Sequence, residues 1–185
     1  MKQSIAGLGV LAFVVTGCVK EEGVVLPPRS EPVATSSSVT SSAPAADPSR
    51  PQPLGTKLDL GKSGAPLEVT ADEINQNSAP TIMPPGGGHW ASVRVETCAK
   101  KDASGPLTVG SSEWSAADAA GVVYNASTLT EVGFPDGQFP TAATIAPGDC
   151  ARGWLMFPAG FRAMLTTVTY TLNSATKATW TAPVQ

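Results

Sequence analysis

The chain is poor in charge. Only 15% of its 185 residues are charged, and 12 Lys and Arg stand against 15 Asp and Glu, for a formal net charge of −3. Affinity for nucleic acid depends on clustered cationic contacts to phosphates. A mildly acidic chain with scattered Lys and Arg is therefore not expected to bind nucleic acid.

Histidine is almost absent, since His89 is the only one. Nucleophilic catalysis by Ser or Cys needs a positioned general base, and the nearest partners, Ser92 and Glu96, belong to no recognised motif. One histidine and dispersed carboxylates also do not supply the usual ligand set of zinc. The sequence therefore predicts no catalytic residues, no cofactor and no metal site. A hydrolase with an unrecognised site is kept only as an alternative.

A long membrane-spanning run is missing as well. The apolar run of residues 5–15 is shorter than the roughly 20 residues that a transmembrane helix needs. Lys2 precedes this run, and the small residues before Cys18 follow it, as is typical of a secretory signal peptide. Cys18 directly after Gly17 resembles the lipobox of bacterial lipoproteins. That resemblance implies a signal peptide over residues 1–17 and lipidation of Cys18.

Two acyl chains on one residue hold a protein stably on a bilayer, whereas a single chain binds only reversibly. We therefore expect the membrane to be one partner of the chain, through a lipid anchor on Cys18. The resulting location is extracytoplasmic, on the outer face of the cell membrane.

Residues 19–55 contain seven prolines, seven serines and no aromatic residue. Such a stretch cannot bury enough apolar surface to offset the entropy of ordering it. The sequence thus predicts that residues 18–55 are a lipidated, disordered tether ahead of a domain over residues 56–185.

The predicted domain consists of short apolar runs separated by Gly, Pro and Asp. Several runs alternate apolar and polar residues, which indicates strands with one buried face. The expected strands cover residues 67–72, 91–98, 107–117, 121–124, 154–157, 168–172 and 178–182. About seven short strands with frequent turns predict an all-β fold, an immunoglobulin-like antiparallel β-sandwich.

Two cysteines remain in this domain. Outside the cytoplasm, two thiols in a small domain are usually bridged. Cys98 ends one expected strand and Cys150 opens another, so antiparallel pairing places them opposite each other. Both cysteines fall on the alternating strand positions that carry polar residues and face away from the core. The disulfide is therefore expected on the outer face of one sheet.

This register makes two further pairs. Glu96 comes to lie opposite Arg152, and Arg94 opposite Trp154, which gives an ion pair and a cation–π contact. The agreement of charge signs supports the register.

Aromatic side chains supply the partner-contact hypothesis. Phe134 and Phe139 flank Asp136-Gly137 in a loop, and Trp154 has the outward parity of Arg152. Exposed aromatics are common binding elements, so these three residues are the expected contacts. The alternative is that both phenylalanine rings fold back over the end of the sandwich.

Several segments resemble a family of uncharacterised immunoglobulin-like domains. These domains are attached to many lipoproteins of high-GC Gram-positive bacteria and are related to a small secreted immunogenic antigen of that group. The segments are Val93–Cys98, Trp114 through Asp118 to Tyr124, and Ala146–Cys150 leading into Gly153–Pro158. The resemblance implies a β-sandwich without family-wide catalytic residues or a cofactor.

These observations predict a membrane-anchored lipoprotein with a non-catalytic binding or accessory domain. Its expected partner is an envelope protein or a cell-wall component. A second hypothesis is a carrier or sensor that takes a small apolar ligand into a pocket between the sheets.

Overall fold

The computed structural model describes residues 46–61, 65–174 and 176–183, which fall in one compact unit, Ser42–Gln185. The predicted signal peptide, Cys18 and most of the predicted tether lie outside the described residues. No helix in the described part of the chain is long and apolar enough to cross a membrane. Because the unit has its own sheets and core, we expect it to fold without the residues that precede it.

The described residues form strands and no α-helix. The strands are β1 (Gln52–Pro53), β2 (Leu58–Asp59), β3 (Leu67–Asn75), β4 (His89–Ala99), β5 (Leu107–Gly110), β6 (Trp114–Asp118), β7 (Val123–Asn125), β8 (Ala142–Ile145), β9 (Cys150–Ala159), β10 (Leu165–Leu172) and β11 (Thr176–Thr181). A short 3-10 turn, Ser111–Glu113, separates β5 from β6.

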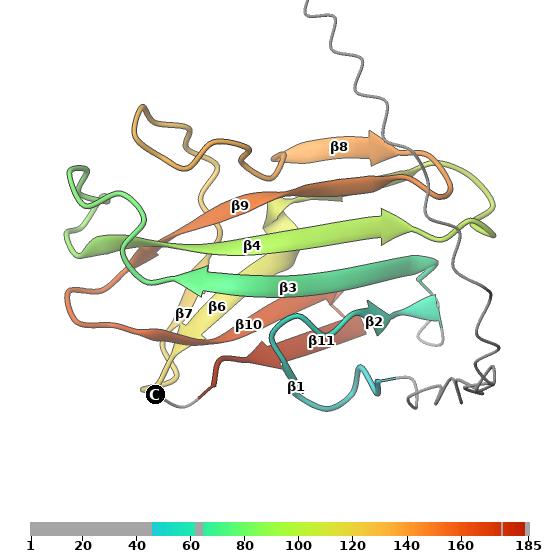
Figure 1. Ribbon diagram of the computed structural model, residues 1–185, viewed down its shortest axis with the longest axis horizontal. Helices are drawn as coiled ribbons and strands as arrows, with labels where there is room; N and C mark the ends of the chain where they lie inside the picture. Colours follow the sequence, from blue (N-terminus) through green and yellow to red (C-terminus); the bar gives the residue numbers. More distant parts are fainter. Residues whose placement is uncertain (1–45, 62–64, 175, 184–185) are drawn as a thin grey trace, which may run out of the picture. The chain divides into compact units, whose positions relative to one another are not determined.

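Two main sheets face each other, with β3, β4 and β9 in one layer and β10, β11 and β6 in the other (Figure 1). The first sheet has the strand order β2-β3-β4-β9, the second has β1-β11-β10-β6-β7, and β5 pairs with β8 in a small third sheet. All pairs are antiparallel except β1 with β11. The predicted all-β sandwich is confirmed.

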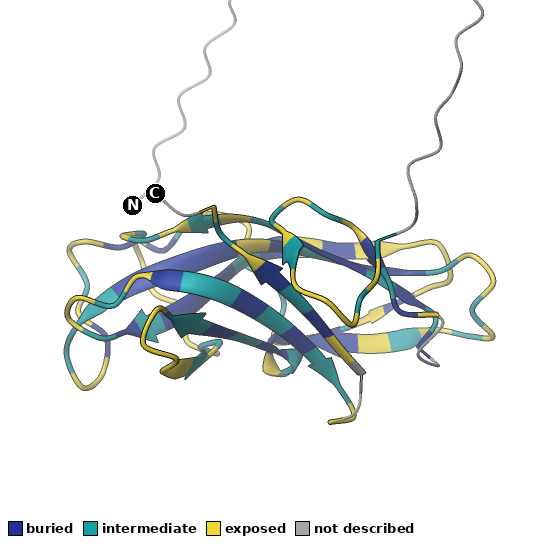
Figure 2. Ribbon diagram, turned by 90° about the horizontal axis from the view of Figure 1, so that it is seen from below, coloured by how far each residue is buried: buried dark blue, intermediate teal, exposed yellow. Residues whose placement is uncertain are grey.

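The core fills the space between the two main sheets. Buried and exposed positions alternate along the strands, as the colours of Figure 2 show. Trp114 stacks on Trp180 with ring centres 5.7 Å apart and meets Tyr170 edge-on at 4.9 Å. Gln76 joins β3 to the start of β10, because its amide donates to the Leu165 carbonyl at 2.8 Å and accepts from the Leu165 N–H at 2.9 Å.

The chain differs from the prediction at residues 107–117, where one strand was expected. The strand breaks at the 3-10 turn, and its first half pairs with β8 instead of joining the main sheet. Gly110 allows this departure, because a Cβ at that position would lie 2.4 Å from the Thr141 carbonyl oxygen.

Ordered structure also begins before residue 56, where the domain was predicted to start. Within the predicted tether, Gln52 and Pro53 form β1 beside Trp180 and Thr181 of β11. The Trp180 indole N–H donates to the Thr56 carbonyl at 2.7 Å. These bonds tie the incoming chain to the sandwich.

Strand β9 is the last strand of its sheet, and a loop closes its free edge. Gln138 forms a parallel bridge with Trp154. The Phe139 N–H donates to the Trp154 carbonyl at 2.9 Å, and the Trp154 N–H donates to the Gly137 carbonyl at 3.0 Å. We call residues 137–139 the edge clasp. Exposed strand edges promote unwanted pairing, so covering this one protects the fold.

Glycine at position 153 makes the edge clasp possible. A Cβ there would lie 2.4 Å from the Phe139 nitrogen and 2.5 Å from the Gly137 carbonyl oxygen. Both neighbours are backbone atoms, so a side chain at 153 could not be accommodated by a change of rotamer.

Replacing Gly153 by alanine tests this close approach. Because the clasp must move away from β9, we expect Gly153→Ala to lower the free energy of unfolding by about 3 kcal/mol. Urea unfolding of the unit Ser42–Gln185 measures the change. Gly105→Ala is the matched control, since nothing lies within 4 Å of its added Cβ. Equal effects of the two substitutions would contradict the role of Gly153.

Candidate binding face around Trp154

The outer face of the β2-β3-β4-β9 sheet carries the predicted disulfide. Cys98 and Cys150 are bonded, and they stand opposite each other at the ends of β4 and β9. Cys98 is nearly buried at 7% exposure, whereas Cys150 is exposed. The predicted bridge and register are confirmed.

One row further along, Arg152 pairs with Glu96. The Arg152 guanidinium donates through Nε to Glu96 Oε2 at 2.6 Å, and its Nη2 contacts the same oxygen. Since Arg152 is exposed, water screens the pair and its contribution to stability is at most about 1 kcal/mol. The pair fixes side chains on the face more than it stabilises the fold.

In the next row Arg94 lies over the Trp154 ring, with its guanidinium carbon 5.8 Å from the ring centre. A bulge in β3 at Asp72 brings two acids beside this arginine. Arg94 lies 3.7 Å from an oxygen of Asp72 and 3.5 Å from an oxygen of Glu73. The cation is thus held from the β3 side and keeps contact with the indole on the β9 side.

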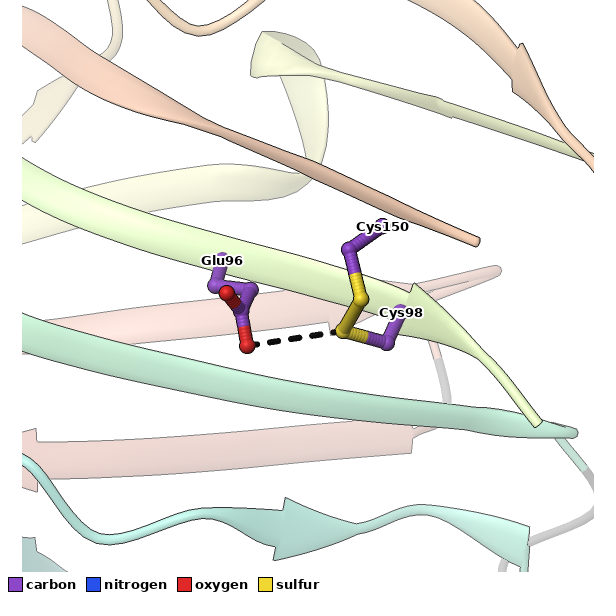
Figure 3. A group of neighbouring side chains, drawn as sticks. All are labelled: Glu96, Cys98 and Cys150. Atoms are coloured by element: carbon purple, nitrogen blue, oxygen red, sulfur yellow. Dashed lines mark hydrogen bonds between the residues drawn. A yellow bond between two sulfur atoms is a disulfide. The ribbon is translucent and has the colours of Figure 1, made fainter. Parts of the chain in front are cut away.

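Glu96, Cys98 and Cys150 lie close together, as Figure 3 shows. One ligand atom from each falls within 4.8 Å of the others, and Glu96 Oε1 is 3.4 Å from the Cys98 sulfur. A metal binds the thiolate form of cysteine, and neither sulfur of a disulfide is a thiolate or carries a proton. In the oxidised protein this group is therefore a structural contact.

The prediction that Phe134 and Phe139 are exposed contacts is wrong, because the two rings are only 7% and 5% exposed. Phe134 packs edge-on against Trp90 with ring centres 4.9 Å apart, in a small cluster with Met156 on the outer face of β4 and β9. Phe139 belongs to the main core and meets Trp114 at 6.4 Å. The rings fold back, as in the alternative, but onto the outer sheet face and into the main core instead of over the end of the sandwich.

Trp154 remains a candidate partner-contact residue, because it is half-buried on the outward face. It borders a depression of about 200 Å³ at the edge of β9. The other walls come from the loop between β7 and β8, which runs beside β9 (Figure 1). The polar contributors to the lining are Ser127, Thr128, Thr130, Gln138 and Thr141.

Sequence reasoning missed these polar lining residues. Their positions depend on how the long loop after β7 folds against β9, and that loop has no period-two pattern to reveal it. The one signal was the three hydroxyl residues at positions 127, 128 and 130, which do not by themselves indicate a site.

His89 lies elsewhere, as the first residue of β4. It lines a separate surface depression of about 360 Å³ together with Phe161 and Arg162. No carboxylate is among the lining residues described there. The hydrolase alternative requires a carboxylate converging on His89, and this depression does not supply one.

Asp118 has a structural task in the turn between β6 and β7. Its carboxylate accepts the N–H groups of Val122 and Ala120 at 2.9 Å each and the Tyr124 hydroxyl at 3.0 Å. These bonds, that of Val122 above all, hold the pKa of Asp118 below its usual value. Burial, together with the bond to Asp118, raises the pKa of Tyr124.

Comparison with solved structures shows which known fold the domain resembles. The structure is similar to that of the secreted protein MPT63 of Mycobacterium tuberculosis, with a TM-score of 0.54 and 20% identity over 71% of this chain and 96% of that one. The domain is an MPT63-like β-sandwich. No family model and no curated protein sequence matches the chain.

Two weaker structural matches come from Bacillus subtilis. The YjhA protein matches with a TM-score of 0.49 and 10% identity, over 71% of this chain and 99% of that one. The lipoprotein candidate YcdA matches with a TM-score of 0.43 and 15% identity, over 62% of this chain and 35% of that one.

Removing the disulfide of the MPT63-like domain should destabilise it substantially. The bridge joins residues separated by 52 positions, and closing a loop of that length restricts the unfolded chain by about 4 kcal/mol. We expect Cys98→Ala/Cys150→Ala to lose about that much in urea unfolding of Ser42–Gln185.

Arg152→Ala is the control from the same face, with an expected loss of at most about 1 kcal/mol. Mass determination under non-reducing conditions should give a wild-type mass lower by two hydrogens, with no alkylatable thiol. A double variant as stable as the wild type would contradict the stabilising role of the bridge.

Proposed function

We propose that the chain is an extracytoplasmic lipoprotein, anchored through Cys18, that displays its MPT63-like sandwich as a non-catalytic binding module. The observation that carries the binding role is Trp154. Trp154 is half-buried and lines a polar depression, whereas Trp90, Trp114 and Trp180 are at most 1% exposed. An accessible aromatic on a rigid sheet is a typical contact residue.

The disulfide supports an extracytoplasmic location. Disulfides form and persist in oxidising compartments and are rare in reducing ones. The proposal therefore joins the lipobox-like sequence before Cys18 to the bridge between Cys98 and Cys150. It also includes membership of the immunoglobulin-like domain family that the motifs of this chain resemble.

The non-catalytic role rests on the environment of the titratable groups. His89 stands in a depression without a described carboxylate, and Asp118 is occupied by the hydrogen bonds of its own turn. Arg94 lies within 4.0 Å of both Asp72 and Glu73. None of these groups is arranged as a general base beside a nucleophile.

A carrier of small apolar ligands is the second candidate function. The space between the main sheets is filled by large side chains, among them Trp114, Tyr170 and Trp180. A groove of about 810 Å³ opens at the border of the two sheets, with Leu54 and Ile74 in its lining. An apolar ligand would therefore bind in this open groove on the surface and would not be enclosed between the sheets.

Lipidation is the direct test of the anchor. Expression of the full-length chain in a bacterium with radiolabelled palmitate should give labelled protein in the membrane fraction. Cys18→Ala should abolish the label, because it removes the sulfur that carries the lipid. Protease added to intact spheroplasts should degrade the anchored domain. Unlabelled protein that remains protected from protease would overturn the proposal.

A further inference from the structure

We propose that the depression beside Trp154 is a binding site for one ring of a neutral saccharide. The inference deepens the proposed function, on which it rests, by naming the class of ligand that the displayed module binds. It follows from the size of the depression, the neutrality of its lining and the position of the indole.

The size selects a small ligand. The depression has a volume of about 200 Å³, below the roughly 300 Å³ at which pockets for drug-sized molecules begin. One pyranose ring fits such a space, whereas a longer glycan would extend from it along the surface.

The lining is polar but carries no charged side chain. A charged ligand would lose its hydration without gaining an opposite charge, which disfavours phosphates, metal ions and charged peptides. An apolar ligand would leave the hydroxyls of Thr130 and Thr141 and the amide of Gln138 without partners. A neutral ligand rich in hydroxyl groups avoids both penalties.

Trp154 supplies the apolar side of the site. Saccharide rings present C–H groups on one face, and an indole offers a flat apolar surface to receive them. Arg94 lies over this indole, and Trp154 is one of the residues that line the depression. The ring is therefore positioned before the ligand arrives.

Both walls of the depression are bonded to β9. The Ser127 N–H donates to the Met156 carbonyl at 2.7 Å, and the Ser127 hydroxyl accepts the Leu129 N–H at 3.1 Å. The edge clasp holds the other wall through Phe139 and Trp154. In an antiparallel strand the N–H and C=O of one residue point to the same side, so the Met156 N–H also faces the loop. A site built in this way needs little ordering when it binds.

Tryptophan fluorescence gives a selective readout. Trp154 is half-buried while the other three tryptophans are buried, so acrylamide should quench Trp154 first. We expect glucose, mannose, galactose or N-acetylglucosamine to protect Trp154 of Ser42–Gln185 from acrylamide. A single ring should bind with a dissociation constant of about 1 mM. The variant Trp154→Phe should lose the protection signal.

Matched variants separate binding from folding. Thr141→Val and Thr130→Val keep the shape of the side chain and remove a hydroxyl from the lining, so each should weaken binding about fivefold. Thr144→Val is the control, because Thr144 is exposed on β8 and does not line the depression. Urea unfolding of each variant checks that it is folded.

Three outcomes would overturn the saccharide site. The first is folded protein in which no sugar of the panel protects Trp154. The second is equal weakening by Thr144→Val and Thr141→Val. The third is protection by a neutral dipeptide amide but by no sugar, which would assign the site to a peptide. The unit Ser42–Gln185 lacks Cys18, so none of these outcomes bears on the palmitate test of the anchor.

Discussion

The structure depends on fixing strand β9 from both sides. On one side β4 pairs with it over ten residue pairs, and the disulfide between Cys98 and Cys150 closes the end of that ladder. On the other side no further strand pairs with it among the described residues. The edge clasp bonds there to the backbone of Trp154, which requires that residue 153 has no side chain. A shift of β9 by one residue would exchange its two faces and break both attachments.

The edge clasp explains why the two loop phenylalanines are buried. The chain passes along the edge of β9, so a side chain before the clasp and one within it reach opposite faces of the sheet. Phe134 packs on Trp90 on the outer face, and Phe139 enters the core on the inner face beside Trp114. The residues that looked most like partner contacts are thus the anchors that hold the loop in place. Trp154 is left as the accessible aromatic of the same neighbourhood.

Period-two alternation was enough to predict the long strands β3, β4, β9 and β10, the outward face of Cys98, and the pairs that Arg94 and Glu96 make. It succeeded because the burial of one face imposes a local pattern on the chain. It failed where backbone contacts between distant segments decide the structure. The break after Gly110 and the clasp at Gly153 both depend on the close approach of another backbone, which no local pattern encodes. The depression beside Trp154 was missed for the same reason, since a loop distant in sequence forms its walls.

Stability and the proposed binding use different parts of the loop between β7 and β8. Its backbone seals the edge of β9, and its buried rings, Phe134 and Phe139, fix its path on the two faces of the sheet. The side chains of Thr130 and Thr141 are exposed and line the depression. Exposed side chains on a fixed backbone can vary at little cost in folding free energy. One sandwich can therefore present different polar linings at the same place, next to an indole whose position Arg94 and the β4–β9 register determine.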